Sequence, residues 1–160
     1  LGADLNVTPY GTEALGVLRI EKGHAAGNEL NGQTTAQMLG LGRMVSGKKD
    51  AIGAVMSRRE GLANDPRRLV GLMPIEAEGT MVAGAHLFTP DAPRNLDHDR
   101  GWVTSACYSP HVGRSIALAY LADPVEGETV IAANPIEGGE LTCRVVSPHF
   151  VDPDGGRLRD

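Results

Sequence analysis

From Arg67 onward, the sequence is divided into six short apolar runs by glycine- and proline-containing turns such as Ser109-Pro110, Asp123-Pro124 and Glu126-Gly127. Runs of this length, separated by turn residues at regular intervals, are typical of strands in an all-β unit. Six such runs predict a small barrel or a jelly-roll-like domain. The expected strands cover residues 68–77, 82–88, 101–108, 115–122, 128–133 and 140–150.

The first sixty residues carry helical patterns instead. Thr12 can cap a helix that runs to about Lys22, and Gly23 follows at the position where glycine commonly ends a helix. The apolar residues of this segment lie nearly all round the helix, which predicts that it is covered on most sides. These residues are Leu15, Val17, Leu18 and Ile20.

Two further elements are expected in this part of the chain. Residues 50–62, with Asp50 as the cap, show a single apolar stripe typical of an amphipathic helix, and residues 41–45 predict a short strand. The predicted fold class is therefore α+β. A partial α/β piece over residues 1–65 would be followed by the six-stranded β-barrel or jelly-roll-like domain over residues 66–160.

Two charged residues, Arg19 and Glu21, lie inside the apolar helix. Residues two apart point about 200° away from each other on a helix, so these two are not expected to pair, and each needs another partner. Burying a charge is costly unless it is paired or hydrogen-bonded. Such residues either lock two elements together or face a ligand cavity, and the residue pattern leaves both alternatives open.

Charge and composition argue against several classes of protein. The net charge is -5 and only six of the 160 residues are aromatic, whereas a nucleic-acid binder is expected to show a basic stripe or stacking aromatics. The longest apolar run, residues 116–122, is far short of the roughly 18 residues of a membrane span. The chain opens with Leu1 and has no signal-peptide pattern, so we expect a fragment of a cytoplasmic protein.

The remaining reactive side chains favour structural roles. Alternation along its strand places Cys143 on the inner face and Arg144 on the other, and no basic neighbour is evident that would activate Cys107 or Cys143, so we expect both in the core. The five histidines are scattered, which argues against a metal site. Residues 97–99 (Asp-His-Asp) are expected in a solvated loop, and residues 152–156 in a terminal turn. No dinucleotide fingerprint is present.

Several motifs resemble those of one family when they are read in order. The segment Tyr10–Leu15 leading into Leu18–Gly23 resembles the C-terminal region of the alpha subunit of heterotetrameric sarcosine oxidase, which itself is similar to the glycine cleavage aminomethyltransferases. The motifs that follow in the family's order are residues 40–42, 47–49, 69–72, 103–105, 109–119 and 148–158.

The resemblance implies a tetrahydrofolate-binding fold that ends in a small β-barrel. In the sarcosine oxidase family, flavin elsewhere in the complex oxidises sarcosine, and tetrahydrofolate captures the one-carbon imine to give glycine and 5,10-methylenetetrahydrofolate. NAD is also expected elsewhere in the complex. The implied partners are folate and the other subunits, with no nucleic acid and no membrane, and the isolated chain is expected to be inactive and able to self-associate.

The resemblance also implies site residues. Tyr10, Thr12 and Glu13 would offer hydrogen bonds to a pterin or its glutamate tail, while Arg19 and Glu21 would anchor the helix beside them. Arg19, Glu21 and Arg43 are also candidate folate-binding residues. Arg43 stands where the glycine cleavage enzymes typically have Trp, and Leu15-Gly16 stands where they have an Arg-Asp pair. The family's reacting carboxylate would lie before residue 1, so no catalytic residue is expected in this chain, which would form one wall of the pocket.

Three other functions remain open. The chain could belong to a stand-alone aminomethyltransferase, to an enzyme similar to dimethylglycine oxidase, or to a non-catalytic binding or assembly module that kept the barrel and lost folate.

Overall fold

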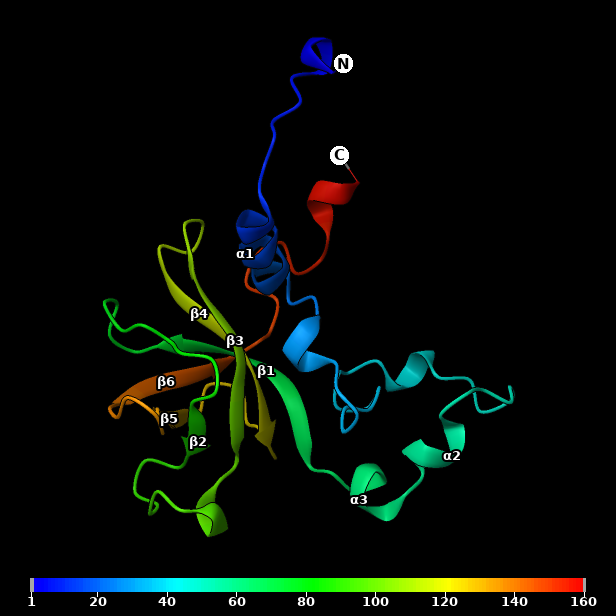
Figure 1. Cartoon of the computed structure of the whole chain (residues 1–160), viewed down its shortest axis with the longest axis vertical. Coiled ribbons are helices and arrows are strands. Elements are labelled where there is room, and N and C mark those ends of the chain that lie inside the picture. The colour runs from blue at the N-terminus through cyan, green and yellow to red at the C-terminus, as the bar shows by residue number, and fades with distance from the viewer. Residues whose placement is uncertain (1, 160) are drawn as a thin grey trace.

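The computed structural model describes residues 2–159 and consists of a closed β-barrel and a long N-terminal segment, part of which lies beside the barrel while the rest extends away from it (Figure 1). Six antiparallel strands form the barrel in the order β1-β4-β3-β2-β5-β6, and β6 pairs with β1 to close it. The strands are β1 (Arg67–Pro74), β2 (His86–Phe88), β3 (Gly101–Ser109), β4 (Arg114–Ala122), β5 (Thr129–Ala133) and β6 (Glu140–Val146).

All six predicted strands are present, and the predicted barrel is confirmed. The largest differences lie in β2, which begins four residues later than expected, and in β6, which ends at Val146 because residues after it leave the sheet to contact the helix. The β3–β4 pair contains a bulge between Val103 and Ser105. A bulge bends the strand and increases its twist, which assists closure of a small barrel.

The core fills the interior of the barrel with aliphatic side chains. Leu72, Leu87, Val103, Leu121 and Val130 are buried in one cluster. Small residues complete the cluster where strands approach closely, and they include Ala117, Ala119, Ala132 and Cys143. Cys143 therefore lies inside the barrel, as predicted from the alternation of residues in β6.

Strand β4 is buried on both faces. Its inward residues Ala117, Ala119 and Leu121 belong to the barrel core, whereas Ile116 and Leu118 belong to a second cluster on the outer surface. A strand covered on both faces reads as a continuous apolar run rather than as an alternating one. The cover on the outer face is supplied by the N-terminal segment.

Residues 2–66 contain three helices, α1 (Thr12–Lys22), α2 (Ala54–Ser57) and α3 (Glu60–Ala63), and no strand. Short 3-10 turns also occur in this segment, at Ala3–Leu5, Gly27–Glu29 and Gly42–Met44, and in the barrel domain at Leu96–His98 and Gly156–Leu158. Only a handful of residues in this segment are buried, and they contact the barrel rather than one another. The segment thus has no core of its own.

The first helix is confirmed, with two differences. It begins at Thr12 with Gly11 in the capping position, so the Thr12 side chain makes no cap hydrogen bond. Gly23 ends it in a left-handed conformation (φ 73°), as expected. The prediction that the helix is covered on most sides is wrong, because Leu15 and Leu18 are each 51% exposed and only Ile20 and Glu21 are buried.

Two predictions in residues 41–62 are also wrong. The expected strand 41–45 contains a 3-10 turn, and the expected helix 50–62 is broken into the single turns α2 and α3. Gly53 adopts a left-handed conformation (φ 88°), and Arg59 between α2 and α3 is extended. Of the apolar residues of the predicted stripe, Leu62 is half-buried, but Ile52, Val55 and Met56 are exposed, and Val55 is 79% exposed. Most of the stability of a helix in a protein comes from packing of its apolar face.

Candidate functional site

Helix α1 lies against the outer face of β3 and β4 (Figure 1). Ile20 is its apolar contact, buried in one cluster with Ile116 and Leu118 of β4. Full burial of a side chain of this size stabilises by about 1.5–3 kcal/mol. The charged residues on either side of Ile20 in sequence, Arg19 and Glu21, supply the polar contacts of the same interface.

Arg19 reaches across to a carboxylate and a hydroxyl. Its guanidinium lies 2.6 Å from Glu29 Oε2 and donates a second hydrogen bond, also 2.6 Å, to Ser105 Oγ on β3. The Ser105 hydroxyl in turn donates to Glu29 Oε1 at 2.6 Å. The three side chains therefore form a closed ring of contacts that joins α1, the turn at Gly27–Glu29 and β3.

Glu29 is the most deeply buried acidic residue of this interface, with 0% of its surface exposed. It also receives hydrogen bonds from the Thr104 hydroxyl (2.5 Å) and from the Ala26 backbone N–H (3.1 Å). Burial raises the pKa of the Glu29 carboxyl, but the donors Ser105, Thr104 and Ala26 and the charge of Arg19 outweigh burial, so the net pKa lies below its ordinary value. Glu29 is therefore a stably ionised group.

Glu21 forms a second polar contact with the same strand. The Ser109 hydroxyl donates to Glu21 Oε1 at 2.5 Å, and both residues are buried. The backbone carbonyl of Glu21 accepts hydrogen bonds from the N–H groups of Phe150 and Val151. Arg19 and Glu21 thus each have a separate partner, as expected from their spacing.

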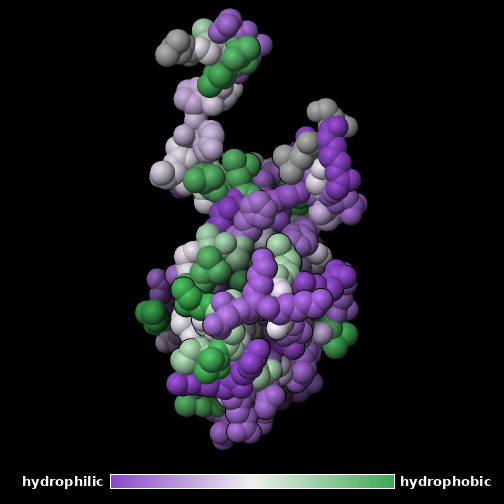
Figure 2. Space-filling view, turned by 90° about the vertical axis from the view of Figure 1, so that its right-hand side faces the viewer, coloured by the Kyte–Doolittle hydropathy of each residue, from purple (hydrophilic) through white to green (hydrophobic). Residues whose placement is uncertain are grey.

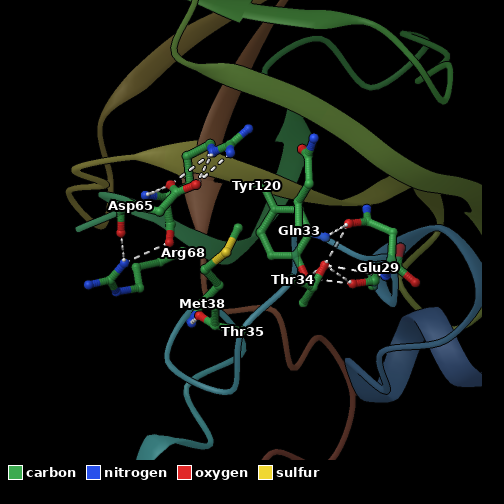
Figure 3. Close-up of polar contacts among 10 residues, drawn as sticks. Glu29, Gln33, Thr34, Thr35, Met38, Asp65, Arg68 and Tyr120 are labelled. Carbon is green, nitrogen blue, oxygen red and sulfur yellow. Dashed lines mark hydrogen bonds and ion pairs between the residues drawn. The ribbon is translucent and has the colours of Figure 1, made fainter. Parts of the chain in front are cut away.

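Tyr120 links the barrel to the turn that carries Glu29. Its hydroxyl donates a 2.7 Å hydrogen bond to the Glu29 backbone carbonyl, which also accepts a hydrogen bond from Thr34 Oγ1. Figure 3 shows the Tyr120 ring lying between Met38 on one side and Gln33, Thr34 and Glu29 on the other. The buried Tyr120 hydroxyl therefore fixes the backbone of the 3-10 turn Gly27–Glu29 to strand β4.

The face of α1 that does not touch the barrel borders an open groove of about 810 Å³. The groove is lined by side chains from α1, from the β3–β4 turn and from the C-terminal segment. Apolar residues (Ala14, Val17, Leu18, Pro110 and Val151) alternate there with charged or titratable ones (Glu21, Lys22, His24, His111, Asp152 and Arg157). Figure 2 shows hydrophobic side chains at the surface where the N-terminal extension joins the body of the molecule. This groove and helix face are the candidate functional site.

The structure separates the predicted site residues into two groups and one outlier. Tyr10, Thr12 and Glu13 are exposed at the start of α1, and none of their side chains has a hydrogen-bond partner within residues 2–159. Arg19 and Glu21 lie at the other end of the helix, in the interface with the barrel. Arg43 is exposed in the 3-10 turn Gly42–Met44, in a part of the segment that lies away from α1 in Figure 1.

The two cysteines are packed rather than activated. Burial raises the pKa of Cys143 to about 12. Burial, together with the nearby negative charge of Glu21, raises the pKa of Cys107 to about 11. The thiolate is the reactive form, so neither thiol is suited to act as a nucleophile.

Both thiols are accordingly expected to resist alkylation in the folded protein. Native protein treated with iodoacetamide at pH 8 should gain less than about 10% label in one hour, because thiols with these pKa values are less than about 1% ionised at that pH. Mass spectrometry would measure the label, and protein unfolded in urea should gain two labels per chain, one on each cysteine. Rapid native labelling of Cys143 would contradict its place inside the barrel.

Other motifs in the sequence form structural contacts. Asp97 and His98 are exposed in the turn Leu96–His98 as expected, whereas Asp99 lies 2.7 Å from His86 Nδ1. Asp152 closes the expected turn by accepting hydrogen bonds from Gly156 and pairs with Lys22 of α1. Within residues 2–159, no three His, Cys, Asp or Glu side chains are placed to bind a metal ion, and no helix has the length and apolar character that crossing a membrane requires.

Glu29 could not be recognised from the sequence. It lies in the polar stretch 24–39, which lacks periodicity, and its partners Thr104 and Ser105 follow 75 and 76 residues later. One signal was available: Arg19 inside an apolar helix required a buried acceptor. That argument indicates that a partner exists without indicating which of the 20 acidic residues supplies it.

Comparisons with known proteins agree with this architecture. Residues 67–152 match the family described as the glycine cleavage T-protein C-terminal barrel domain. The chain is 44% identical to the sarcosine oxidase subunit alpha of Rhizobium meliloti (strain 1021) over 98% of its own length and 16% of that protein. It is 33% identical to the same subunit of Corynebacterium sp. (strain U-96), over 98% of the chain and 17% of the relative.

Aminomethyltransferases show a similar relationship at lower coverage. The enzyme of Nitrosococcus oceani is 33% identical over 89% of this chain and 37% of the relative. The crystal structure of the glycine cleavage system aminomethyltransferase T from Bartonella henselae superimposes with a TM-score of 0.72 and 27% identity, covering 95% of this chain and 42% of that one. The chain thus spans about a sixth of the sarcosine oxidase subunits and about two fifths of the transferases.

Proposed function

Because this chain belongs to the glycine cleavage T-protein family and carries its C-terminal barrel domain, we propose that it is the C-terminal portion of the alpha subunit of a sarcosine oxidase. The parent complex would oxidise sarcosine to glycine and pass the one-carbon unit to tetrahydrofolate. The observation that carries the proposal is that alpha subunits match 98% of the chain, at 44% identity in one species and 33% in another. Three aminomethyltransferases match 89–92% of the chain at 31–34% identity.

Within the parent, residues 1–65 would complete a folate-binding domain and residues 66–160 would be the barrel domain that braces it. The match to the barrel family begins at residue 67, which supports this division. Flavin and NAD would be held elsewhere in a cytoplasmic complex that contains other subunits. The exposed Leu15 and Leu18 further support self-association of the chain when it is alone.

The open face of α1 would form one wall of the folate site. Tyr10, Thr12 and Glu13 offer a phenol, a hydroxyl and a carboxylate that have no partner within residues 2–159, and the apolar groove begins at Ala14. Ligand sites combine apolar walls with a few polar groups in this way. Bound tetrahydrofolate would supply the nitrogen atoms that capture the one-carbon unit, while these residues would hold and orient it.

The decisive measurement uses the full-length parent complex. With sarcosine and oxygen, we expect glycine, hydrogen peroxide and, by hydrolysis of the imine, formaldehyde. Added tetrahydrofolate should capture the imine, so that 5,10-methylenetetrahydrofolate forms in place of formaldehyde. The isolated 160-residue chain should oxidise nothing and should bind tetrahydrofolate with a Kd of about 1 mM or weaker by calorimetry, since it offers a single wall. Tight binding by the isolated chain would contradict the half-site proposal.

A second candidate is a stand-alone aminomethyltransferase, favoured by the structural superposition over 95% of the chain. That parent would form methylenetetrahydrofolate from a protein-bound aminomethyl group and would not consume oxygen with sarcosine. A dinucleotide-binding half in the gene before Leu1 would favour the oxidase, and a short folate half would favour the transferase. If the parent is not retained on immobilised folate, a non-catalytic module is the better description.

A further inference from the structure

Glu29 has no part in the proposed folate wall, yet it is the point at which three elements meet. It contacts Arg19 of α1, Thr104 and Ser105 of β3, and the backbone of its own turn at Ala26. Within residues 2–159, each polar contact of its carboxylate is with a hydrogen-bond donor, and none of its surface is exposed. Its contacts therefore bear on the placement of α1.

Two polar contacts define how α1 lies on β3. Arg19 meets Ser105, and Glu21 meets Ser109, four residues further along the strand. Four strand residues correspond to about 13 Å, so the two contacts fix the direction of the helix on the sheet as well as its rotation. The ring of 2.6 Å contacts among Arg19, Ser105 and Glu29 holds the first of these two points.

Stability alone does not account for this arrangement. A buried ion pair is often no more stabilising than apolar residues of similar volume, and Ile20 already provides apolar burial at the same place. Apolar contact is non-directional, however, and would permit the helix to rotate or slide. Charge-assisted hydrogen bonds are short and geometrically specific, so Glu29 supplies orientation.

We propose that Glu29 is a positioning residue for folate capture: through Arg19 it sets the orientation of α1, and thereby of Thr12 and Glu13 about two turns away and of Tyr10 just before the helix. This inference rests on the proposed function of the α1 face. Glu29 does not touch the ligand, and its effect is transmitted by the helix. Sarcosine oxidation by the parent complex would not depend on it.

The test is Glu29→Gln in the full-length parent complex. Glutamine retains an oxygen acceptor for Thr104 and Ser105 but removes the charge that holds Arg19. We expect the KM for tetrahydrofolate in methylenetetrahydrofolate formation to rise about tenfold, since misplacement of about 1 Å can cost up to about a hundredfold. The kcat of sarcosine oxidation without folate should stay within about twofold of wild type.

Glu128→Gln is the matched control. Glu128 pairs with Arg100 at 2.7 Å with side chains 21% and 22% exposed, at the start of β3 and not at α1. The Glu128→Gln substitution should lower the thermal stability of the complex and leave the KM for tetrahydrofolate unchanged. An unchanged KM in Glu29→Gln, or an equal rise in both variants, would overturn the inference. If the Glu29→Gln complex does not assemble, Ser105→Ala replaces it in the test, because it removes only the hydroxyl that bridges Arg19 and Glu29. The same changes in the KM for tetrahydrofolate are then expected, and the same results would overturn the inference.

A second readout separates failure of this inference from failure of the proposed function. Hydrogen exchange of residues 12–22 in the same complex should be faster in Glu29→Gln than in Glu128→Gln, whatever reaction the parent performs. A parent that neither oxidises sarcosine nor forms methylenetetrahydrofolate would refute the proposed function. Exchange of residues 12–22 that is equal in the two variants would refute the positioning role.

Discussion

Arg19→Ala is expected to lower the free energy of unfolding by about 3 kcal/mol. The substitution leaves the fully buried Glu29 carboxylate without its counter-charge, and breaking a buried ion pair in this way typically costs roughly 3–5 kcal/mol. The 22% exposure of the Arg19 side chain places the expected value at the lower end of that range. Urea denaturation at pH 7, monitored by circular dichroism, would measure the change.

Arg43→Ala is the control for the loss of an arginine. Arg43 is exposed and has no ion-pair partner within residues 2–159, so its replacement should change stability by less than about 0.5 kcal/mol. If Arg19→Ala and Arg43→Ala have equal effects, the ring formed by Arg19, Ser105 and Glu29 contributes nothing to stability. Normal folate affinity together with normal stability in Arg19→Ala would also refute its role as an anchor in the parent.

The effect of Arg19→Ala should depend on pH with a definite sign. In the wild type the pKa of Glu29 is lowered in the folded state, so its contribution to stability is present above the ordinary value of 4.5 and is lost as pH falls through the folded pKa. Without Arg19 the buried carboxylate gains by binding a proton. The stability difference between wild type and variant should therefore be largest near pH 7 and shrink as the pH falls toward and below the ordinary value of 4.5.

Gly101→Ala is expected to destabilise the barrel by about 3 kcal/mol or more. Gly101 has a φ of 145°, and a Cβ at this position would lie 1.9 Å from the carbonyl oxygen of Tyr120 on the neighbouring strand β4. Overpacking and an unfavourable φ each cost roughly 1–3 kcal/mol. Because Gly101 pairs with Leu87 of β2 as well as with Leu121 of β4, displacement would disturb both neighbours.

Gly84→Ala separates the cost of the steric clash from the cost of the unfavourable φ. Gly84 also has a positive φ (87°), but no heavy atom lies within 4 Å of a Cβ there, so only the conformational cost of about 1 kcal/mol applies. Thermal unfolding should show a fall in Tm of roughly 10 °C for Gly101→Ala and of a few degrees for Gly84→Ala. Equal shifts in Tm would mean that β3 and β4 can move apart at Gly101, and so accommodate the added methyl group, without a loss of stability.

The barrel could be predicted because its signals are local. Each strand is bounded by turn residues such as Ser109-Pro110 and Asp123-Pro124, and alternation in β6 placed Cys143 inside. The helix 12–22 could be predicted for the same reason, since its periodicity and the glycine at its end lie within one short segment.

The predictions that failed concern segments whose conformation or burial depends on tertiary contacts. Residues 50–62 have a helical pattern, but most of their apolar stripe (Ile52, Val55 and Met56) is exposed, and the left-handed Gly53 interrupts the segment. Leu15 and Leu18 of α1 are likewise half-exposed, because they lie on the side of the helix that does not pack on the barrel. Glu29 is the converse case, because a polar, aperiodic segment supplies the most deeply buried carboxylate of the interface, and its partners Thr104 and Ser105 lie on a distant strand.

Closure of the barrel between β1 and β6 has a consequence for the order of events during synthesis. Residues 71–74 pair with residues 143–146, so the sheet cannot close until residues 143–146 have left the ribosome. Helix α1 is made before its docking partners Ser105 and Ser109, which follow 86 and 88 residues later. Contacts of such long sequence separation form slowly. The docking of α1 on the barrel is therefore a late step in the folding of this region, and the side of α1 that packs on β3 and β4 stays open until those strands are made.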